Sequence, residues 1–150
     1  MINLDHILER AEQKCKSNDA RLTIKRKQLL AGLLHSEKAI SAYELADYCT
    51  KQFQQKFPIM TTYRILAFLE KVSFVHKLQT SNKYVACSHI ACEHEHLVPQ
   101  FLICQQCGKV KEIHINKATI DELSQNVKQV GFSLISPQLE IRCLCDECAE

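Results

Sequence analysis

Hydrophobic residues recur at helical spacing through the first half of the chain. Between residues 4 and 17 they occupy positions 4, 7, 8 and 11, which is typical of an amphipathic helix. Thr23 is placed to cap a second helix that ends near His35, and residues 41–44 form the S-x-x-E capping box of a third. A fourth helix is expected from about Met60 to Ser73. Its apolar positions follow the i, i+3, i+4, i+7 rule: Ile65, Phe68, Leu69 and Val72.

Two short apolar stretches come directly after the fourth helical pattern. Residues 74–78 and 83–87 have strand character, and the polar segment 79–82 separates them, so a hairpin is predicted. Short helices followed by a hairpin are typical of a winged helix-turn-helix, in which the fourth helix reads DNA and the hairpin is the wing. Tyr63 is expected to point away from the core, because it lies about 200° from Ile65 around the helix.

The second half of the chain has a different pattern. A strand is expected at residues 109–115, where polar and apolar positions alternate, and another at residues 100–103. Asn116 can cap a helix that ends at Gly131. Residues 132–141 predict another strand, interrupted at Pro137, which indicates an edge position or a bulge. This half is therefore expected to be a small unit of strands and one helix.

Charge also divides the chain into two halves. The 150 residues are 46% hydrophobic with a formal net charge of +2. Residues 1–83 carry 14 Lys and Arg against 8 Asp and Glu, whereas residues 84–150 carry 5 against 9. A basic first half indicates contact with a polyanion. No apolar run approaches the ~20 residues of a membrane span, and the first residues lack a secretory signal, so a cytoplasmic protein with no membrane partner is expected.

Candidate DNA contacts lie at the start of the second helix, at the start of the fourth helix and on the wing. Hydroxyl groups and helix N-termini suit phosphates, and Arg suits a guanine edge or a phosphate. Any single basic residue could instead be an ordinary solvated surface charge. The prediction of DNA binding therefore concerns the winged helix-turn-helix as a whole. The candidates are Arg21, Arg26, Thr61, Thr62, Tyr63, Arg64 and Lys77.

Cysteine is the most informative residue type, with nine in the chain. In a reducing compartment, clustered cysteines more often bind metal than form disulfides. Two C-x-x-C pairs supply four thiolates, a donor set that selects zinc; the alternative is buried thiols or a redox dithiol. Cys15 and Cys49 fall on apolar helix faces and are expected in the core. The four thiolates belong to Cys104, Cys107, Cys145 and Cys148.

A second group of metal-binding residue types joins the basic half to the acidic half. Nitrogen and sulfur ligands drawn from both halves would allow a metal ion to clasp them together. The alternative is a polar hinge with incidental histidines. The group comprises His76, Cys87, His89, Cys92, Glu93, His94, Glu95, His96 and Glu112.

Taken together, these segments resemble the ferric uptake regulator family, and within it the zinc uptake regulator branch. The resemblance covers nearly the whole chain. The matching segments are residues 21–23 with Arg26, residues 62–69, the wing segments 74–77 and 84–87, and residues 101–112. Two features depart from the family: Ser73 stands where relatives usually have Gly, and Cys92 and Cys143 are extra thiols.

The resemblance implies a fold and two zinc ions per chain. The expected fold is α+β, with a winged helix-turn-helix domain (1–86), a hinge (87–98) and a small α/β dimerisation domain (99–150) stapled by a four-cysteine zinc site. The structural zinc is expected on the two C-x-x-C pairs. The regulatory zinc is expected on His76, Cys87, His96 and Glu112, with His94 as the alternative hinge ligand.

The resemblance also implies a function. A homodimer would bind palindromic operator DNA when the regulatory zinc is bound, and would repress zinc uptake genes. Zinc would hold the two reading helices about one DNA turn apart, roughly 34–36 Å. The alternatives are an iron, manganese or peroxide sensor of the same family, and a thiol-redox or zinc-buffering protein that does not act on DNA. An enzyme with a small organic substrate is not expected, because no nucleophile–base set is present and a four-thiolate site has no open position.

Overall fold

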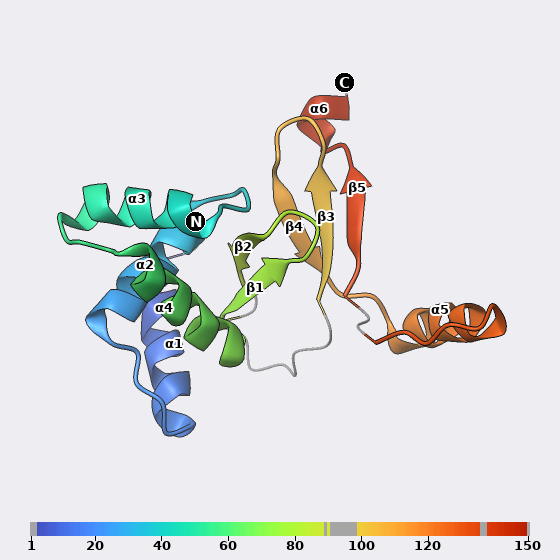
Figure 1. The fold of residues 1–150 in the computed structure, drawn as a ribbon, viewed down its shortest axis with the longest axis horizontal. Helices are drawn as coiled ribbons and strands as arrows, with labels where there is room; N and C mark the ends of the chain where they lie inside the picture. Colours follow the sequence, from blue (N-terminus) through green and yellow to red (C-terminus); the bar gives the residue numbers. More distant parts are fainter. Residues whose placement is uncertain (1–2, 89, 91–98, 136–137, 150) are drawn as a thin grey trace. The chain divides into compact units, whose positions relative to one another are not determined.

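The computed structural model describes residues 3–88, 90, 99–135 and 138–149 (Figure 1). The chain separates into two compact units, Met1–His94 and Glu95–Glu150, and each is described by itself. Within the described residues, no helix has the length and apolar character needed to cross a bilayer. The first unit contains α1 (Leu4–Ser17), α2 (Ile24–His35), α3 (Ala42–Phe53), α4 (Ile59–Lys71), β1 (Val75–Leu78) and β2 (Lys83–Ala86). The second contains β3 (Gln100–Cys104), β4 (Val110–Ile113), α5 (Lys117–Gln129), β5 (Glu140–Cys143) and α6 (Asp146–Ala149).

The first three helices begin where a polar side chain satisfies a backbone N–H group of the first turn. Asn3 caps α1, and the Thr23 hydroxyl accepts an N–H group of α2 at 3.3 Å. At α3 the predicted capping box is present, because Ser41 Oγ accepts the Glu44 N–H at 3.1 Å while the Glu44 carboxylate accepts the Ser41 N–H at 3.3 Å. In contrast, α4 begins after Pro58 without a side-chain cap. The sequence therefore located these helix starts to within one residue.

The core of the first unit is built from leucines of α2, α3 and α4. Leu29, Leu45 and Leu66 are all completely buried. The predicted core positions of Cys15 and Cys49 are confirmed, because both side chains are at most 1% exposed. Gly32 allows α2 to approach α3 closely, since a Cβ atom at this position would lie 2.9 Å from Cys49 Sγ. This packing fixes α4 and its exposed face on a rigid base.

The predicted hairpin is also confirmed. β1 and β2 pair antiparallel from Val75↔Ala86 to Leu78↔Lys83, and Ile40 adds an isolated bridge to Tyr84. Ser73 precedes the hairpin with φ +64°, a left-handed conformation that glycine adopts at lower cost. Ser73 therefore differs from the glycine of relatives in residue type only, because its backbone has the conformation that glycine would adopt.

The second unit is a three-stranded sheet of order β4-β3-β5 with one long helix. β4 pairs antiparallel with β3, whereas β5 pairs parallel with it from Phe101↔Glu140 to Cys104↔Cys143. The predicted helix from Asn116 to Gly131 is confirmed, and Gly131 has φ +87°. The strand predicted at 132–141 is wrong in most of its length, because β5 starts at Glu140 and residues 132–135 form no strand. The pairing available on β3 decides where this strand begins, whereas the prediction used only local alternation.

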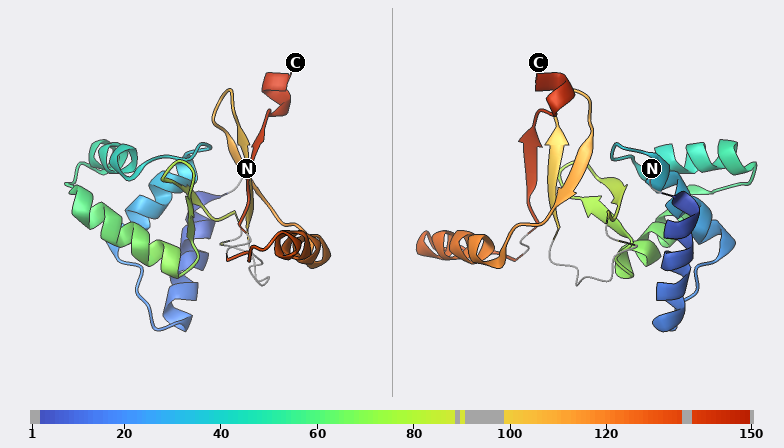
Figure 2. Two further views of the ribbon diagram at one scale, coloured as in Figure 1. Left: turned by 45° about the vertical axis from the view of Figure 1, so that its right-hand side comes forward. Right: turned by 180° about the vertical axis from the view of Figure 1, so that it is seen from behind.

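α5 stands away from the sheet of its own unit (Figure 2). None of its residues is buried. The segment at its C-terminal end exposes three large apolar side chains: Val130 is 72% exposed, Phe132 70% and Ile135 98%. An apolar surface of this kind on a single chain usually marks an interface.

Candidate metal centre and nucleic-acid interface

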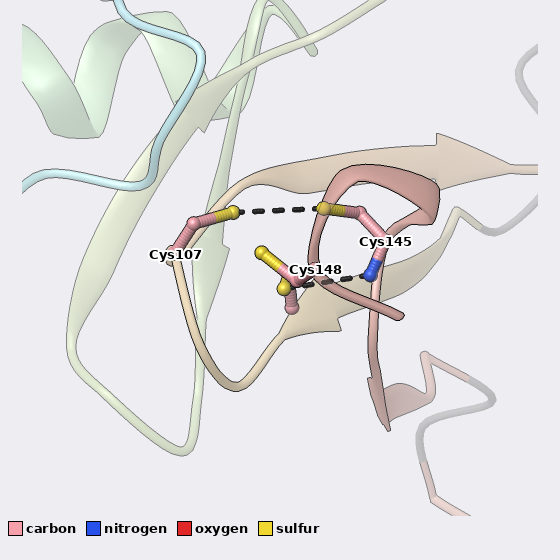
Figure 3. A group of neighbouring side chains, drawn as sticks. Cys107, Cys145 and Cys148 are labelled. Atoms are coloured by element: carbon pink, nitrogen blue, oxygen red, sulfur yellow. Dashed lines mark hydrogen bonds between the residues drawn. The ribbon is translucent and has the colours of Figure 1, made fainter. Parts of the chain in front are cut away.

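The four predicted thiol ligands come together at one end of the sheet in the second unit. The Sγ atoms of Cys104, Cys107, Cys145 and Cys148 all lie within 4.8 Å of one another. Cys104 ends β3, Cys107 lies in the turn before β4, and Cys145 and Cys148 lie before and within α6. Figure 3 shows Cys107, Cys145 and Cys148 converging from the two turns, with Cys107 Sγ 3.8 Å from Cys145 Sγ.

Backbone hydrogen bonds form the two turns that carry these sulfur atoms. In the first turn, the Cys104 N–H donates to Lys109 O at 2.9 Å and the Gly108 N–H donates to Cys104 O at 3.0 Å. Gly108 has φ +79°, a left-handed conformation that glycine adopts at low cost, and this allows the chain to turn here. In the second turn, the Cys148 N–H donates to Cys145 O at 2.9 Å. The positions of the sulfur atoms are thus set by the backbone before a metal binds.

The electrostatics of the cluster favour a bound cation. Backbone N–H groups of Cys107 and Cys145 point at Cys104 Sγ and lower the pKa of that thiol to about 6. Hydrogen bonding to the Cys145 thiol, together with burial and the other nearby thiols, raises the pKa of Cys148 to about 12. Four crowded sulfur atoms cannot all become anionic without a positive charge between them. Four thiolates around one point are the closed tetrahedral donor set of structural zinc, so the residues fit this metal.

The predicted regulatory ligands are distributed over both units. On the hairpin of the first unit, a ring nitrogen of His76 and Cys87 Sγ lie within 4.8 Å of each other. Cys87 is buried, and its N–H donates to Phe74 O at 2.8 Å, which holds the thiol at the end of β2. Glu112 lies on β4 of the second unit, in register with Phe101. His96 and the alternative His94 lie outside the described residues.

The exposed N-terminal part of α4 carries most of the predicted reading residues. Tyr63 is 40% exposed, Arg64 is exposed and Thr61 is half-buried. Thr62 is different, because its side chain is completely buried and its hydroxyl donates to Pro58 O at 3.1 Å. The structure therefore directs the Thr62 hydroxyl into the unit, away from the surface on which it was predicted to contact DNA. No signal in the sequence distinguishes the two roles, because a threonine one turn after a proline is equally suited to either.

The basic residues at the start of α2 differ in their exposure and in the contacts that their side chains make within the unit. Arg21 is exposed. The Arg26 guanidinium lies 3.7 Å from the centroid of the Phe68 ring and donates to Arg21 O at 2.7 Å. Arg26 therefore joins α2 to α4, and its charge is partly engaged inside the unit. Lys77 on the wing is half-buried, with its Nζ 6.0 Å from the centroid of the Tyr84 ring.

Two further exposed residues were not predicted from the sequence. Tyr43, at the start of α3, is 66% exposed and makes an edge-to-face contact with Tyr63, with ring centroids 6.3 Å apart. Met60 is also 63% exposed on α4. An aromatic residue outside the buried stripe of a helix was the available signal, since Tyr43 follows Ala42 and precedes Leu45, both of which are buried.

A winged helix-turn-helix unit joined to a four-thiolate unit defines a metal-dependent regulator of the helix-turn-helix class. The family model of the ferric uptake regulator family matches residues 17–142. The chain is 35% identical over 144 residues to the zinc uptake regulation protein of Escherichia coli K12, covering 96% of this chain and 82% of that protein. It is 30% identical to the ferric uptake regulation protein of Helicobacter pylori, covering 98% and 94%.

Solved structures agree with the sequence relatives. A zinc uptake regulator complexed with zinc and DNA superposes with a TM-score of 0.84 at 31% identity, over 99% of this chain and 97% of that one. Holo XcZur superposes with a TM-score of 0.77 at 33% identity, over 95% and 96%. The chain belongs to the ferric uptake regulator family. The predicted α+β fold, with its winged helix and four-cysteine site, is confirmed, and the family is one of regulators rather than enzymes.

Proposed function

We propose that this protein is a zinc-responsive transcriptional repressor of zinc uptake genes, acting in the cytoplasm. The observation that carries the proposal is that one unit holds both an exposed reading helix, α4, and a His76–Cys87 donor pair. The similarity to a zinc uptake regulator complexed with zinc and DNA supports it over nearly the whole chain.

The proposal assigns two zinc ions to each chain. The structural ion is held by Cys104, Cys107, Cys145 and Cys148, which ties the turn after β3 to α6. Because a complete thiolate set leaves no position for water, this ion supplies stability rather than catalysis. The regulatory ion is held by His76, Cys87, His96 and Glu112, so that its ligands come from both predicted domains.

Regulation follows from where the regulatory ligands are attached. Without this ion, the winged helices of a dimer sample many orientations, and only some of them fit DNA. Binding of His76, Cys87, His96 and Glu112 to one cation restricts those orientations to the competent set. A coupling free energy of ~1–3 kcal/mol changes DNA affinity about 5- to 150-fold.

The DNA contacts are assigned to members of the predicted set that are exposed or half-buried. Tyr63 and Arg64 on α4 are assigned to base edges, whereas Thr61, Arg21 and Lys77 are assigned to phosphates. Arg26 acts by supporting α4 through Phe68.

A homodimer is part of the proposal, because palindromic DNA requires two reading helices. The exposed residues Val130, Phe132 and Ile135, together with the unburied helix α5, supply an apolar surface on the second unit. A second copy of this unit would bury that surface and stabilise α5.

An iron-responsive regulator is the second candidate, because the Helicobacter pylori relative is a ferric uptake regulation protein. Regulatory sites for iron or manganese favour nitrogen and oxygen ligands, whereas the Cys87 thiolate favours zinc. A redox or zinc-buffering protein that does not bind DNA is the third.

The test is DNA binding titrated with metal. Purified protein would be assayed for zinc content, and its binding to palindromic duplex would be followed by fluorescence anisotropy under reducing conditions with Zn²⁺, Fe²⁺ or Mn²⁺. We expect two zinc ions per chain, the second required for tight binding. The His76→Ala and Cys87→Ser variants should lose zinc dependence, whereas the matched controls His6→Ala and Cys143→Ser should keep it. Unchanged zinc dependence in both site variants would disprove the assignment.

A further inference from the structure

A fifth sulfur atom lies beside the four-cysteine cluster. Cys143 is half-buried on β5, and its register partner across the parallel β3–β5 pair is Cys104. It is not among the four cysteines whose Sγ atoms lie within 4.8 Å of one another. Cys143 is therefore next to the proposed zinc site without belonging to it.

The strand pairing places Cys143 within disulfide reach of Cys104. Register partners on neighbouring strands point to the same face of the sheet, and neighbouring strands are about 4.8 Å apart. A disulfide requires Cα atoms roughly 4.4–6.8 Å apart. The Gln105 N–H donates to Cys143 O at 2.9 Å, so the pairing continues past this point and fixes the two residues side by side.

A cavity gives small molecules access to this pair. Its volume is about 270 Å³, and its lining includes Cys104, Cys143 and Cys145. This is far larger than the space that one water molecule needs, so a molecule the size of hydrogen peroxide fits. The core thiols Cys15 and Cys49 differ in this respect, because both side chains are at most 1% exposed.

We propose that Cys143 is an oxidation site that releases the structural zinc by forming a disulfide with Cys104. The oxidant is a hydroperoxide. This goes beyond the proposed zinc response, because it adds a second input that acts on the structural site instead of the regulatory one. It rests on the proposed function only in requiring that the four thiolates hold zinc.

Formation of the Cys104–Cys143 disulfide takes two steps. In the first, the Cys143 sulfur attacks hydrogen peroxide, an S–O bond forms, the O–O bond breaks, and water leaves a sulfenic acid on Cys143. In the second, the Cys104 thiolate attacks the Cys143 sulfur, an S–S bond forms, and the sulfenic oxygen leaves as water after taking up a proton. Two thiols and one peroxide thus give one disulfide and two waters, and the zinc site loses one of its four ligands. A cellular dithiol reductant reverses the disulfide.

The test uses zinc-loaded, full-length protein treated with hydrogen peroxide. Zinc release is followed with a chromogenic chelator, and disulfides are assigned by tandem mass spectrometry of proteolytic fragments. The variants Cys143→Ser and Cys143→Val remove the thiol while keeping the strand, and Cys15→Ala is the control that removes a thiol elsewhere. We expect a Cys104–Cys143 disulfide in the wild type and several-fold slower zinc release in both Cys143 variants, with Cys15→Ala behaving as the wild type.

Two results would overturn the inference. One is a disulfide map that contains only links within the pairs Cys104–Cys107 and Cys145–Cys148. The other is zinc release that is equally fast with and without Cys143. A protein that carries no tightly bound zinc before oxidation would instead contradict the proposed structural site, and the disulfide map would still show whether Cys143 pairs with Cys104.

Discussion

At the scale of single residues, small side chains determine how closely the elements of this protein pack and how its metal site is prepared. Gly32 has no Cβ, and this allows the sulfur atom of Cys49 to sit against the backbone of α2. Gly108 permits the turn in which two sulfur atoms face one point. Gly32 is thus needed for close packing of two helices, whereas Gly108 is needed for a left-handed backbone conformation at the four-cysteine cluster.

Replacement of Gly32 by alanine should destabilise the first unit. Alanine favours a helix interior over glycine by about 1 kcal/mol. However, the new Cβ would lie 2.9 Å from Cys49 Sγ and 3.0 Å from Leu45 Cδ1, and overpacking of this kind costs roughly 1–3 kcal/mol. We expect a net loss, measured as a lower urea midpoint. The double variant Gly32→Ala/Cys49→Ala should recover part of it, and an equally stable single variant would contradict the packing argument.

Zinc binding to the four-cysteine site should depend on pH. The thiol of Cys104, with a pKa of about 6, is mostly ionised at neutral pH, whereas that of Cys148, with a pKa of about 12, keeps its proton until a cation binds. Binding at neutral pH should therefore release protons, and affinity should fall as the pH drops through 6, because Cys104 must then lose a proton too. Calorimetry in buffers of different ionisation enthalpy measures the protons released. Affinity that stays constant down the acidic range would argue against thiolate ligands.

At the scale of elements, helix α4 separates a buried face from a face available to DNA. Thr62, Ile65 and Leu69 form the buried face, whereas Tyr63 and Arg64 lie outside it. Adjacent residues of the same helix thus have opposite roles, and substitutions can distinguish them.

Arg64→Ala should weaken operator binding by about 1–3 kcal/mol, the value typical of a base-contacting arginine. Thr62→Val should leave operator binding nearly unchanged, because the Thr62 hydroxyl donates to Pro58 O and the side chain is completely buried. Both are measured by anisotropy at fixed salt concentration, with zinc present. Comparable losses in the two variants would show that the orientation assigned to α4 is incorrect.

Most elements were predictable from the sequence, because their ends are set by local chemistry. Ser41 with Glu44, and Asn116 with Gly131, define helix ends through side-chain caps and backbone conformation alone. The four-cysteine cluster was also predictable, since a C-x-x-C turn is local. The start of β5 and the burial of Thr62 were not, because both depend on partners distant in sequence or on the packing of a whole helix.

At the scale of the whole molecule, the second unit has more apolar surface than its own sheet covers. α5 has no buried residue, and Val130, Phe132 and Ile135 are all strongly exposed. A helix of 13 residues is marginal in water without tertiary packing. An association of two copies is therefore expected to supply the packing that one chain lacks.

Charged substitutions in this surface should break the dimer. Val130→Lys and Phe132→Lys place an ammonium group where apolar contact is proposed, so zinc-loaded protein should sediment as a monomer. The control Ser133→Lys adds the same charge at a neighbouring exposed residue and should remain dimeric. Sedimentation velocity distinguishes these outcomes, and dimers in all three variants would place the interface elsewhere.

The cysteine pairs flank α5 in the sequence, one before it and one after it. A metal ion bound by all four sulfur atoms therefore closes a loop that contains the entire proposed interface. Closure of the loop restricts the conformations that it can adopt. If metal binding favours dimerisation in this way, dimerisation must raise the affinity of the site for the metal by the same factor. Dilution of the protein alone should make its zinc easier to remove, so that chelator resistance becomes a function of protein concentration.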